Sequence, residues 1–467
     1  LPSPLVVLSF SLSFLQLVIT FDLYLSLSQT AFDSSPLTVA TAVFLCTEMK
    51  SSRPLLGACR LLVVGGGSAG LGMVSKMARK LPKGSITLID SVQTHYYQPG
   101  FTLVGAGLMN LEQNRRKQKD LIPPGVNWIK DRVISFDPHN NSVRTKEGSK
   151  IDYDYMVICT GIEIRLDMIE GLAESIKDQT CPVSTIYLPE YAEKTYRLLT
   201  SVDKGNFLFS FPNTPIKCAG APQKICYIAD DILRSRGIRS STSLHYFTTL
   251  PRIFGVEKYA NALMKVVKDR DINVHTRHSL KKIDGKNKIA TFENLEDSSN
   301  VQMEFSFLHV GPPCSPIESL RSSPSLTDSN GWVDVNAVTL QSTRFSNIFS
   351  LGDCTNTPNA KTAAAISSQL KAIEKNLWDA MNGKPLLAKY DGYASCPLLV
   401  SRSKVILAEF SGSSPLESFP FDQSKPSRFS FLLKRYLMPW LYWNGLIKGL
   451  WNGPSTIRKF IAPFKRN

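Results

Sequence analysis

Cysteine is scarce in this sequence, with nine residues in a chain of 467. So few cysteines do not make a disulfide scaffold, and no CxxC or CxxxH pair gives metal-ligand spacing. The sequence therefore predicts no metal site. It leaves redox, catalytic or simply buried thiols as the roles open to these cysteines.

Basic residues are absent from the first 47 positions of the chain. The apolar stretch at residues 5–20 therefore lacks the n-region of a secretory signal and the Arg-rich pattern of a mitochondrial transit peptide. Met49 opens a more ordinary sequence. We expect residues 1–48 to be an extension translated from upstream sequence, and the alternative is an apolar anchor.

The composition shows no bias towards disorder. The fractions of hydrophobic residues (43%) and charged residues (20%) are those of a globular protein, and the length suits two or three domains. The formal net charge of +15 favours an acidic partner, which leaves nucleic acid, an anionic membrane surface and an anionic substrate open.

A glycine turn follows the first clear strand pattern. Residues 61–64 form an apolar run, and helical spacing of apolar residues starts at Leu71. Between them, Gly65, Gly67 and Gly70 occupy G-x-G-x-x-G positions, where the tight turn and the approach of a pyrophosphate exclude side chains. A second strand at residues 85–89 ends in Asp90, whose carboxylate can bind adenosine ribose hydroxyls. Together these features predict a dinucleotide site.

Two later segments favour FAD over NAD as the dinucleotide. Residues 153–161 give a buried strand that ends at Thr-Gly, similar to a strand of flavoproteins with two dinucleotide-binding domains. Residues 347–351 give another strand, followed by Gly352 and Asp353, whose carboxylate is placed for the ribityl chain. A helix then opens at Lys361, and its N-terminal dipole and ammonium group can stabilise a reduced isoalloxazine. The alternative for Lys361 is an exposed lysine at an alanine-rich helix start.

A second glycine fingerprint is missing from the middle of the chain. Strand patterns at residues 207–211, 243–248 and 272–274 surround a predicted helix at 222–236, which indicates a second Rossmann-like domain. Where a pyridine-nucleotide enzyme carries its glycines, residues 211–222 instead contain Lys217 and Cys218. A thiol near a helix N-terminus and next to Lys217 should have a lowered pKa and act as a nucleophile. Cys226 falls inside the helix and is interpreted as a packing residue.

These motifs carry a family resemblance. The motifs lie at residues 217–222, 390–398, 95–99, 104–107, 352–356 and 437–439. On these motifs, the chain resembles the sulfide:quinone oxidoreductase family over residues 61–464, its mitochondrial members in particular. The resemblance implies that Cys218 and Cys396 are the catalytic redox pair, bridged by extra sulfur in the resting enzyme. It implies FAD as cofactor, hydrogen sulfide as substrate and ubiquinone as electron acceptor. Glutathione or sulfite would accept the sulfane sulfur.

The resemblance also assigns flavin contacts by position. Beyond the glycines, they are Ser68, Ala69, Asp90, Gln98, Val133, Gly352, Asp353, Lys361, Thr362, Ala363 and Ala364. Ala69 stands where the family usually has Gly, and Asp90 where Glu is common, so the contacts at these two positions are open. Cys181 lies near the place of a third cysteine in bacterial relatives, but its surroundings match poorly, and we expect it to be structural.

The C-terminal segment is both basic and aromatic. No Asp or Glu follows Asp422, while Lys, Arg, Trp and Tyr accumulate, and no apolar run there is long enough to span a bilayer. Amphipathic helices on an anionic membrane surface fit this pattern, and a dimer interface or capping helix pair is the alternative. Nucleic acid is not expected, because no recognition motif accompanies the charge. With the family resemblance, this predicts peripheral or monotopic attachment to the mitochondrial inner membrane.

The predicted fold class is therefore α/β, with two Rossmann-like dinucleotide-binding domains and a C-terminal amphipathic membrane-binding region. The expected boundaries are an N-terminal extension (1–60), the first part of the FAD-binding domain (61–200), the second Rossmann-like domain (201–335), the second part of the FAD-binding domain (336–390) and a redox-cysteine and membrane-anchoring region (391–467).

Overall fold

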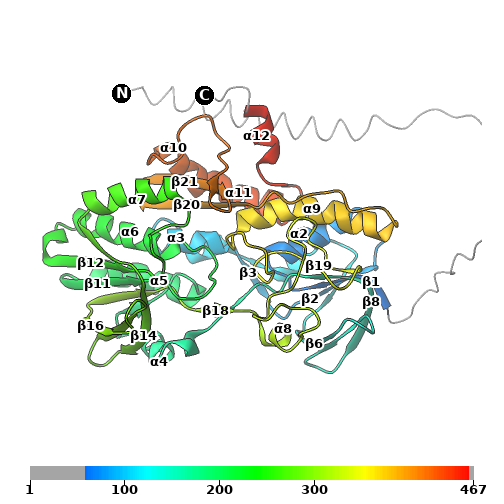
Figure 1. Cartoon of the computed structure of the whole chain (residues 1–467), viewed down its shortest axis with the longest axis horizontal. Coiled ribbons are helices and arrows are strands. Elements are labelled where there is room, and N and C mark those ends of the chain that lie inside the picture. The colour runs from blue at the N-terminus through cyan, green and yellow to red at the C-terminus, as the bar shows by residue number, and fades with distance from the viewer. Residues whose placement is uncertain (1–57, 462–467) are drawn as a thin grey trace, which may run out of the picture. The chain divides into compact units, whose positions relative to one another are not determined.

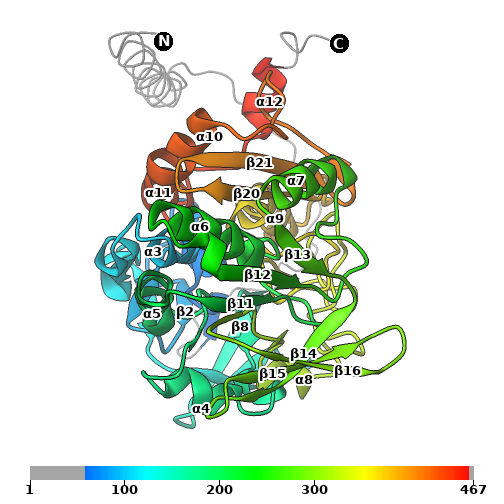
Figure 2. The same ribbon diagram turned by 90° about the vertical axis from the view of Figure 1, so that its left-hand side faces the viewer.

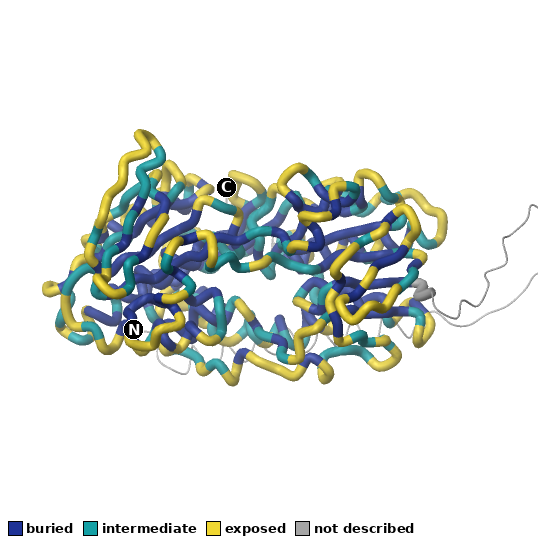
Figure 3. Tube along the Cα trace, turned by 90° about the horizontal axis from the view of Figure 1, so that it is seen from below, coloured by how far each residue is buried: buried dark blue, intermediate teal, exposed yellow. Residues whose placement is uncertain are grey.

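The computed structural model describes residues 58–461 (Figure 1). The predicted N-terminal extension therefore lies outside the described residues, apart from positions 58–60. Two largely parallel sheets carry the core, and Figure 3 shows that buried stretches of the trace run through the interior of the molecule. The α/β class with two Rossmann-like sheets is confirmed, whereas the domain boundaries stay a prediction.

The first sheet is built around β1 (Ala58–Val64), and residues 61–64 are buried because both faces of this strand are covered. Continuous apolar runs of this kind are typical of central parallel strands. The parallel neighbours are β2 (Ile86–Ile89), β5 (Val126–Ile129), β8 (Lys150–Ile158) and β19 (Ile348–Ser350), and the antiparallel extension is β6 (Val133–Asp137) and β7 (Ser142–Thr145). Helices α2 (Ser68–Met77) and α9 (Ala363–Met381) pack together over this sheet.

The second sheet has the order β10-β17-β11-β12-β13, and all of its strands are parallel. Its strands are β10 (Val183–Ser184), β11 (Gly205–Ser210), β12 (Thr242–Phe247), β13 (Ile272–His275) and β17 (Phe307–Val310), and its helices are α5 (Pro189–Ser201), α6 (Ala221–Ser235) and α7 (Glu257–Asp269). The strand–turn–helix unit β11–α6 corresponds to the predicted strand and helix around Cys218. An antiparallel sheet extends this half, with β14 (His278–Asp284), β15 (Ile289–Asn294) and β16 (Asn300–Glu304).

Short elements connect these layers. They are β3 (Thr94–Tyr96), β4 (Arg115–Lys117), β9 (Glu163–Ile164), β18 (Cys314–Ser315), α3 (Phe101–Gly105), α4 (Leu172–Lys177) and α8 (Glu318–Arg321), with 3₁₀ turns η1 (Gln98–Gly100), η2 (Leu111–Asn114), η3 (Gln118–Asp120), η4 (Leu166–Met168) and η5 (Arg239–Ser241). The β3–β4 hairpin pairs residues 94–96 with 115–117.

The C-terminal region begins with an antiparallel sheet that packs on α6 (Figures 1 and 2). It contains β20 (Tyr393–Ser401), β21 (Lys404–Ser411) and β22 (Ser414–Pro415). A chain of short helical turns follows, with α10 (Arg428–Leu432), the π-helical η6 (Leu433–Leu437), α11 (Met438–Leu441), the π-helical η7 (Tyr442–Leu446) and α12 (Ser455–Ile461). Among residues 58–461, no helix has the length and hydropathy needed to cross a membrane.

Candidate active site

The glycine turn between β1 and α2 needs its glycines for different reasons. Gly65 has φ +98°, and a Cβ on Gly70 would collide with the carbonyl oxygen of Gly65. Gly67, in contrast, faces open space. The Gly66 N–H donates to the Asp90 carboxylate, and the Gln118 side chain donates to the Gly66 carbonyl at 2.8 Å. The turn is therefore held rigidly from two sides.

This turn fits a dinucleotide phosphate. No side chain caps the N-terminus of α2, so its first N–H groups face the space beside Gly67. Ser68 and Ala69 form the first turn of that helix. Asp90 directly follows β2, and burial raises the pKa of its carboxyl group. The structure therefore brings together the five predicted residues of the turn and the acid beyond it.

The second predicted flavin segment lies after β19. Gly352 has φ +82°, and its N–H donates to the Gln369 side chain at 2.8 Å. Burial raises the pKa of Asp353. Thr362 caps α9 by accepting a hydrogen bond from the Ala365 N–H at 3.1 Å, and Ala363 and Ala364 form the first turn.

Lys361 braces this segment in a way that the sequence did not indicate. Its ammonium donates to the carbonyls of Asp353 (2.7 Å) and Thr355 (3.0 Å) and lies 4.1 Å from the centre of the Trp332 ring. Burial lowers the pKa of this lysine. Its role towards a reduced isoalloxazine stays a prediction.

The remaining predicted contacts lie on different elements. Val133 begins β6 and packs in the core beneath the ends of β1 and β2. Gln98 begins η1 and accepts a hydrogen bond from the Lys217 ammonium at 2.7 Å. Through this hydrogen bond, Gln98, a predicted flavin contact on η1, is connected to the loop that carries Cys218.

The structure brings Cys218 and Cys396 together from separate parts of the chain. Cys218 lies in the turn before α6 and Cys396 lies on β20, and their sulfur atoms are 3.9 Å apart. Cys218 has φ +52°, a conformation that non-glycine residues rarely adopt. Its N–H donates to the Lys361 carbonyl at 2.8 Å, and its carbonyl accepts from Tyr187 at 3.1 Å. These two bonds hold the residue in its strained conformation.

A buried lysine contacts the thiol pair. The Lys224 ammonium, in the first turns of α6, lies 3.1 Å from the Cys218 sulfur. The Cys396 thiol and this ammonium hold the pKa of Cys218 well below its usual range, whereas hydrogen bonding to Cys218 and burial raise the pKa of Cys396. The arrangement therefore stabilises a thiolate on Cys218 beside a neutral thiol on Cys396.

The sequence-based explanation for this thiolate named the wrong lysine. Lys217 was expected to lower the pKa of Cys218, but its ammonium is directed to Gln98. Side chains of adjacent residues point in different directions, so sequence adjacency does not place the two groups together. At the helix start, the Ala221 N–H donates to the Cys218 carbonyl at 2.8 Å and not to its sulfur, so the expected effect of the helix N-terminus on the pKa of the thiol stays a prediction.

Sequence reasoning also missed Lys434, which is 2% exposed and faces the same thiol pair from η6. Burial and the charge of Lys224 lower its pKa to about 7. The sequence contains a weak indication that Lys224 is buried, since it lies on the same helix face as the apolar Ile228 at i, i+4 spacing. Lys434 had none, because it stands in a basic segment that was interpreted as a surface.

The other cysteines with a role proposed from sequence are packed in the interior. Cys226 is buried within α6, as expected, and burial raises its pKa. Cys181 is buried at the base of the second sheet, with its sulfur 3.7 Å from the Gly285 carbonyl. Neither lies with the Cys218–Cys396 pair.

A cavity of about 340 Å³ adjoins the Cys218 loop. Ala219, the next residue after Cys218, lines it together with Ile216, Trp332, Thr355 and Lys361. The cavity therefore lies between the loop of Cys218 and the segment that leads into α9.

Tyr442 joins the C-terminal segment to the glycine turn. Its hydroxyl lies 2.7 Å from the Ser68 hydroxyl and 2.6 Å from His95 Nε2, and its ring packs on Tyr97 at 4.7 Å between centroids. Burial lowers the pKa of His95 to about 4, so this imidazole is neutral at pH 7. No local sequence pattern indicates this contact, because it joins segments more than 300 residues apart.

Comparisons with known proteins agree with this geometry. The family model of pyridine nucleotide-disulphide oxidoreductases matches residues 59–196 and 233–368. The mitochondrial sulfide:quinone oxidoreductase of Mus musculus is 40% identical over 438 residues, which cover 91% of this chain and 97% of that protein. The protein of the same name from Dictyostelium discoideum is 41% identical and covers 91% and 94%. The chain belongs to the sulfide:quinone oxidoreductase family.

Membership of the sulfide:quinone oxidoreductase family makes the chain a flavin-dependent oxidoreductase. A solved structure supports the fold independently. The sulfide:quinone oxidoreductase of Aquifex aeolicus aligns with a TM-score of 0.73 at 20% identity and covers 88% of this chain and 96% of its own. The family resemblance inferred from the motifs is thereby confirmed.

The glycine turn gives a first prediction. Gly70→Ala should lower the free energy of unfolding by about 1–3 kcal/mol, because the new methyl group overlaps backbone. Gly67→Ala should leave stability without added FAD unchanged but weaken flavin binding, because its methyl group enters the open space. Urea unfolding with and without added FAD separates the two effects. If both variants changed the free energy of unfolding without FAD by the same amount, the different roles assigned to Gly70 and Gly67 would be wrong.

The Tyr442 contact gives a second prediction. Tyr442→Phe leaves the polar groups of Ser68 and His95 without their partner, and we expect the Kd for FAD to rise about tenfold. Tyr436→Phe is the matched control, since Tyr436 lies in the same segment and is 62% exposed. The Kd of each variant is measured by flavin fluorescence as FAD is titrated into protein from which the flavin has been removed. An unchanged Kd in Tyr442→Phe would remove the proposed link.

The thiolate gives a third prediction. Lys224→Met removes the cation beside Cys218, so the pKa of Cys218 should rise and the pH profile of its alkylation by iodoacetamide should move to higher pH. Lys217→Met should leave that profile in place, because its ammonium contacts Gln98. A larger shift in Lys217→Met than in Lys224→Met would restore the original sequence-based interpretation.

Proposed function

We propose that the protein is an FAD-dependent sulfide:quinone oxidoreductase that uses Cys218 and Cys396 as its redox pair. It oxidises hydrogen sulfide, reduces ubiquinone and delivers the sulfane sulfur to a small acceptor such as glutathione or sulfite. The observation that carries the proposal is the 3.9 Å approach of two sulfur atoms from different elements, with the Lys224 ammonium beside one of them.

The replacement of the second glycine fingerprint supports sulfide over a pyridine nucleotide as electron donor. The turn between β11 and α6 is where a second dinucleotide would be bound by this fold. In this chain the turn carries Lys217 and Cys218 in place of the glycine pattern. Electrons therefore enter through sulfur.

The proposed reaction starts from one extra sulfur atom that bridges Cys218 and Cys396. Hydrosulfide attacks the Cys396 sulfur, forms a new S–S bond there and breaks the bond to the bridging sulfur. Cys396 then carries a persulfide, and Cys218 carries a persulfide anion. The Lys224 ammonium stabilises this anion as it does the thiolate.

The acceptor removes the outer sulfur of the Cys396 persulfide and leaves a Cys396 thiolate. Re-forming the bridge between Cys396 and the sulfur on Cys218 is a two-electron oxidation, with FAD, when bound, as the electron acceptor. The sum is one sulfide and one thiol converted to a persulfide, with release of two electrons and two protons. Lys434 adds a second positive charge near the pair below about pH 7, where its amine is protonated. Its charge favours an anionic acceptor such as sulfite.

FAD fits the residues of the glycine turn and of the segment before α9. The groups that would hold it are Gly65, Gly67, Ser68, Ala69, Gly70, Asp90, Gln98, Val133, Gly352, Asp353, Lys361, Thr362, Ala363 and Ala364. When bound, FAD supplies two-electron chemistry between the sulfur pair and the quinone. The Cys218 N–H bond to Lys361 fixes the nucleophile to the same segment.

Attachment to the mitochondrial inner membrane is part of the proposal. The relatives from mouse and Dictyostelium are named mitochondrial. Phe429, Leu432, Tyr436, Trp440 and Leu450 of the C-terminal segment are exposed, and basic residues lie between them. A surface of this kind supports peripheral binding, which gives access to a quinone dissolved in the bilayer.

The fourth prediction concerns the electron donor. Anaerobic sulfide should bleach the flavin absorbance of the purified protein, whereas NADH should not, because the second dinucleotide turn lacks its glycines. Rapid bleaching by NADH with no response to sulfide would reverse the proposal.

The control for this experiment is Cys396→Ser, which keeps the size of the side chain but cannot hold the bridge. We expect a loss of sulfide-dependent quinone reduction of at least about 100-fold, with flavin content unchanged. Full turnover in this variant would exclude the two-cysteine mechanism.

A further inference from the structure

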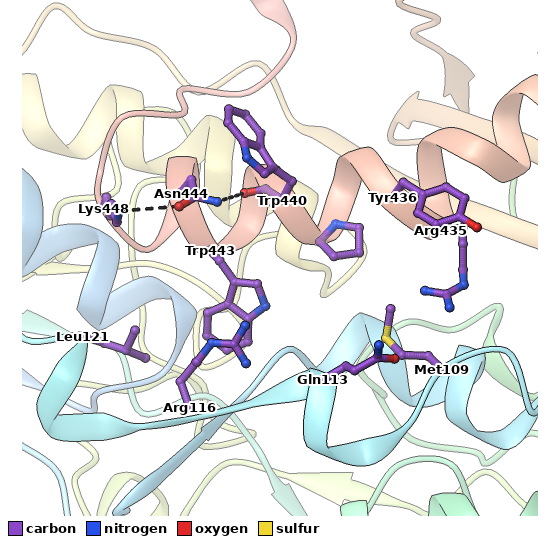
Figure 4. Close-up of a pocket in the computed structure, with 11 residues that line it drawn as sticks. Met109, Gln113, Arg116, Leu121, Arg435, Tyr436, Trp440, Trp443, Asn444 and Lys448 are labelled. Atoms are coloured by element: carbon purple, nitrogen blue, oxygen red, sulfur yellow. Dashed lines mark hydrogen bonds between the residues drawn. The ribbon is translucent and has the colours of Figure 1, made fainter. Parts of the chain in front are cut away.

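A second cavity, of about 470 Å³, lies between the β3–β4 region and the C-terminal helical turns. Met109, Gln113, Arg116 and Leu121 line one side, and residues of η6, α11 and η7 line the other (Figure 4). Its volume is within the range of small-molecule sites. No step of the proposed sulfur chemistry uses it.

Three cations line this cavity: Arg116, Arg435 and Lys448. Figure 4 shows Arg116 extending from its strand towards Trp443, and its guanidinium lies 4.9 Å from the centre of that ring. Arg435 lies over Tyr436 at 5.2 Å. Both guanidinium groups contact aromatic rings, and Arg116 also donates to the Arg115 carbonyl at 2.7 Å, so each group keeps further N–H donors for a ligand.

None of these three cations forms an ion pair with a carboxylate among residues 58–461. The neighbouring Arg115, in contrast, pairs with Glu112 at 2.7 Å. No acidic residue lines the cavity. The positive charge of the residues that line the cavity therefore favours binding of an anion from outside the protein.

The rim of the cavity identifies the kind of anion. Tyr436 (62% exposed) and Trp440 (45% exposed) line the cavity and reach solvent. Leu432 and Phe429 are also exposed, about one turn and two turns before Tyr436. Apolar and aromatic side chains at this position add contacts for acyl chains and for the membrane interface, but none for a free phosphate. The combination matches a phosphate ester at the surface of a bilayer.

We propose that this cavity binds the phosphate of an anionic phospholipid headgroup, with Arg116 and Arg435 as its principal donors. The site rests on the proposed membrane association and adds a specific contact to it. It also assigns a membrane role to β4, which is distant in sequence from the C-terminal segment. Guanidinium groups suit this role because they bind phosphate oxygens through two N–H donors.

Vesicle binding of the full protein with bound flavin tests the proposal. Vesicles of phosphatidylcholine alone are compared with vesicles that also contain phosphatidylglycerol. Loss of any one basic residue near the surface should weaken binding to the anionic vesicles about fivefold through diffuse attraction. Arg116→Gln should weaken it by about tenfold or more, and Arg116→Gln with Arg435→Gln by about 100-fold, because direct hydrogen bonds are lost.

Lys117→Gln is the matched control. Lys117 follows Arg116 on β4, carries the same charge and does not line the cavity, since successive strand residues point to opposite faces. High salt should abolish the loss caused by Lys117→Gln but retain part of the loss caused by Arg116→Gln. Flavin content must be equal in all variants, which verifies that they fold.

The outcomes separate the two levels of the proposal. If the unmodified protein binds neither type of vesicle, both the membrane association and the lipid site are wrong. If it binds and Arg116→Gln weakens binding no more than Lys117→Gln, only the lipid site is wrong.

Discussion

The approach of Cys218 to Cys396 beside Lys224 is the contact on which the rest of the site depends. The two cysteines come from the second Rossmann-like half and from the C-terminal sheet, so the contact exists only because β20 packs on α6. Gly220 makes this packing possible, since a Cβ there would lie 2.7 Å from the Cys396 sulfur. A buried ammonium is unfavourable without an anion, and the Cys218 thiolate supplies that anion. Lys224 and Cys218 therefore stabilise each other's charged forms.

The cofactor segments are connected to this thiol pair through backbone. The Lys361 carbonyl accepts from Cys218, while the Lys361 ammonium holds the carbonyls of residues 353 and 355. On the other side, Tyr442 joins the C-terminal turns to Ser68 and His95. Leu446 and Ile447 are buried in the same core as α2 and α9. The C-terminal segment is thus part of the flavin-binding half, and its removal would expose that core.

The sequence predicted those features that depend on local pattern. The strand before Gly65, the helix after it and the second strand–helix unit around Cys218 follow from runs of apolar residues and from backbone requirements. The cysteine pair required the family resemblance, because residues 178 positions apart give no local signal of contact. Lys434 and Tyr442 escaped prediction for the same reason, whereas Lys224 lies only six positions after Cys218 and its place on the buried helix face was a weak local sign. The expectation that Lys217 lowers the pKa of Cys218 is wrong, because neighbouring positions in the sequence do not place the Lys217 ammonium beside the Cys218 sulfur.

The structure of η6 shows where two of the chain's positive charges are directed. Two consecutive residues of this π-helical segment carry cations in different directions, Lys434 into the protein towards the thiol pair and Arg435 to the cavity at the surface. Consecutive side chains of a helix point in different directions around its axis, so one turn can line both sites. A shift of η6 caused by an anion at Arg435 would change the position of Lys434 relative to Cys218. The proposed surface site and the thiol pair therefore share a single turn of backbone, and π-helical winding of the kind found at this turn often occurs at functional sites.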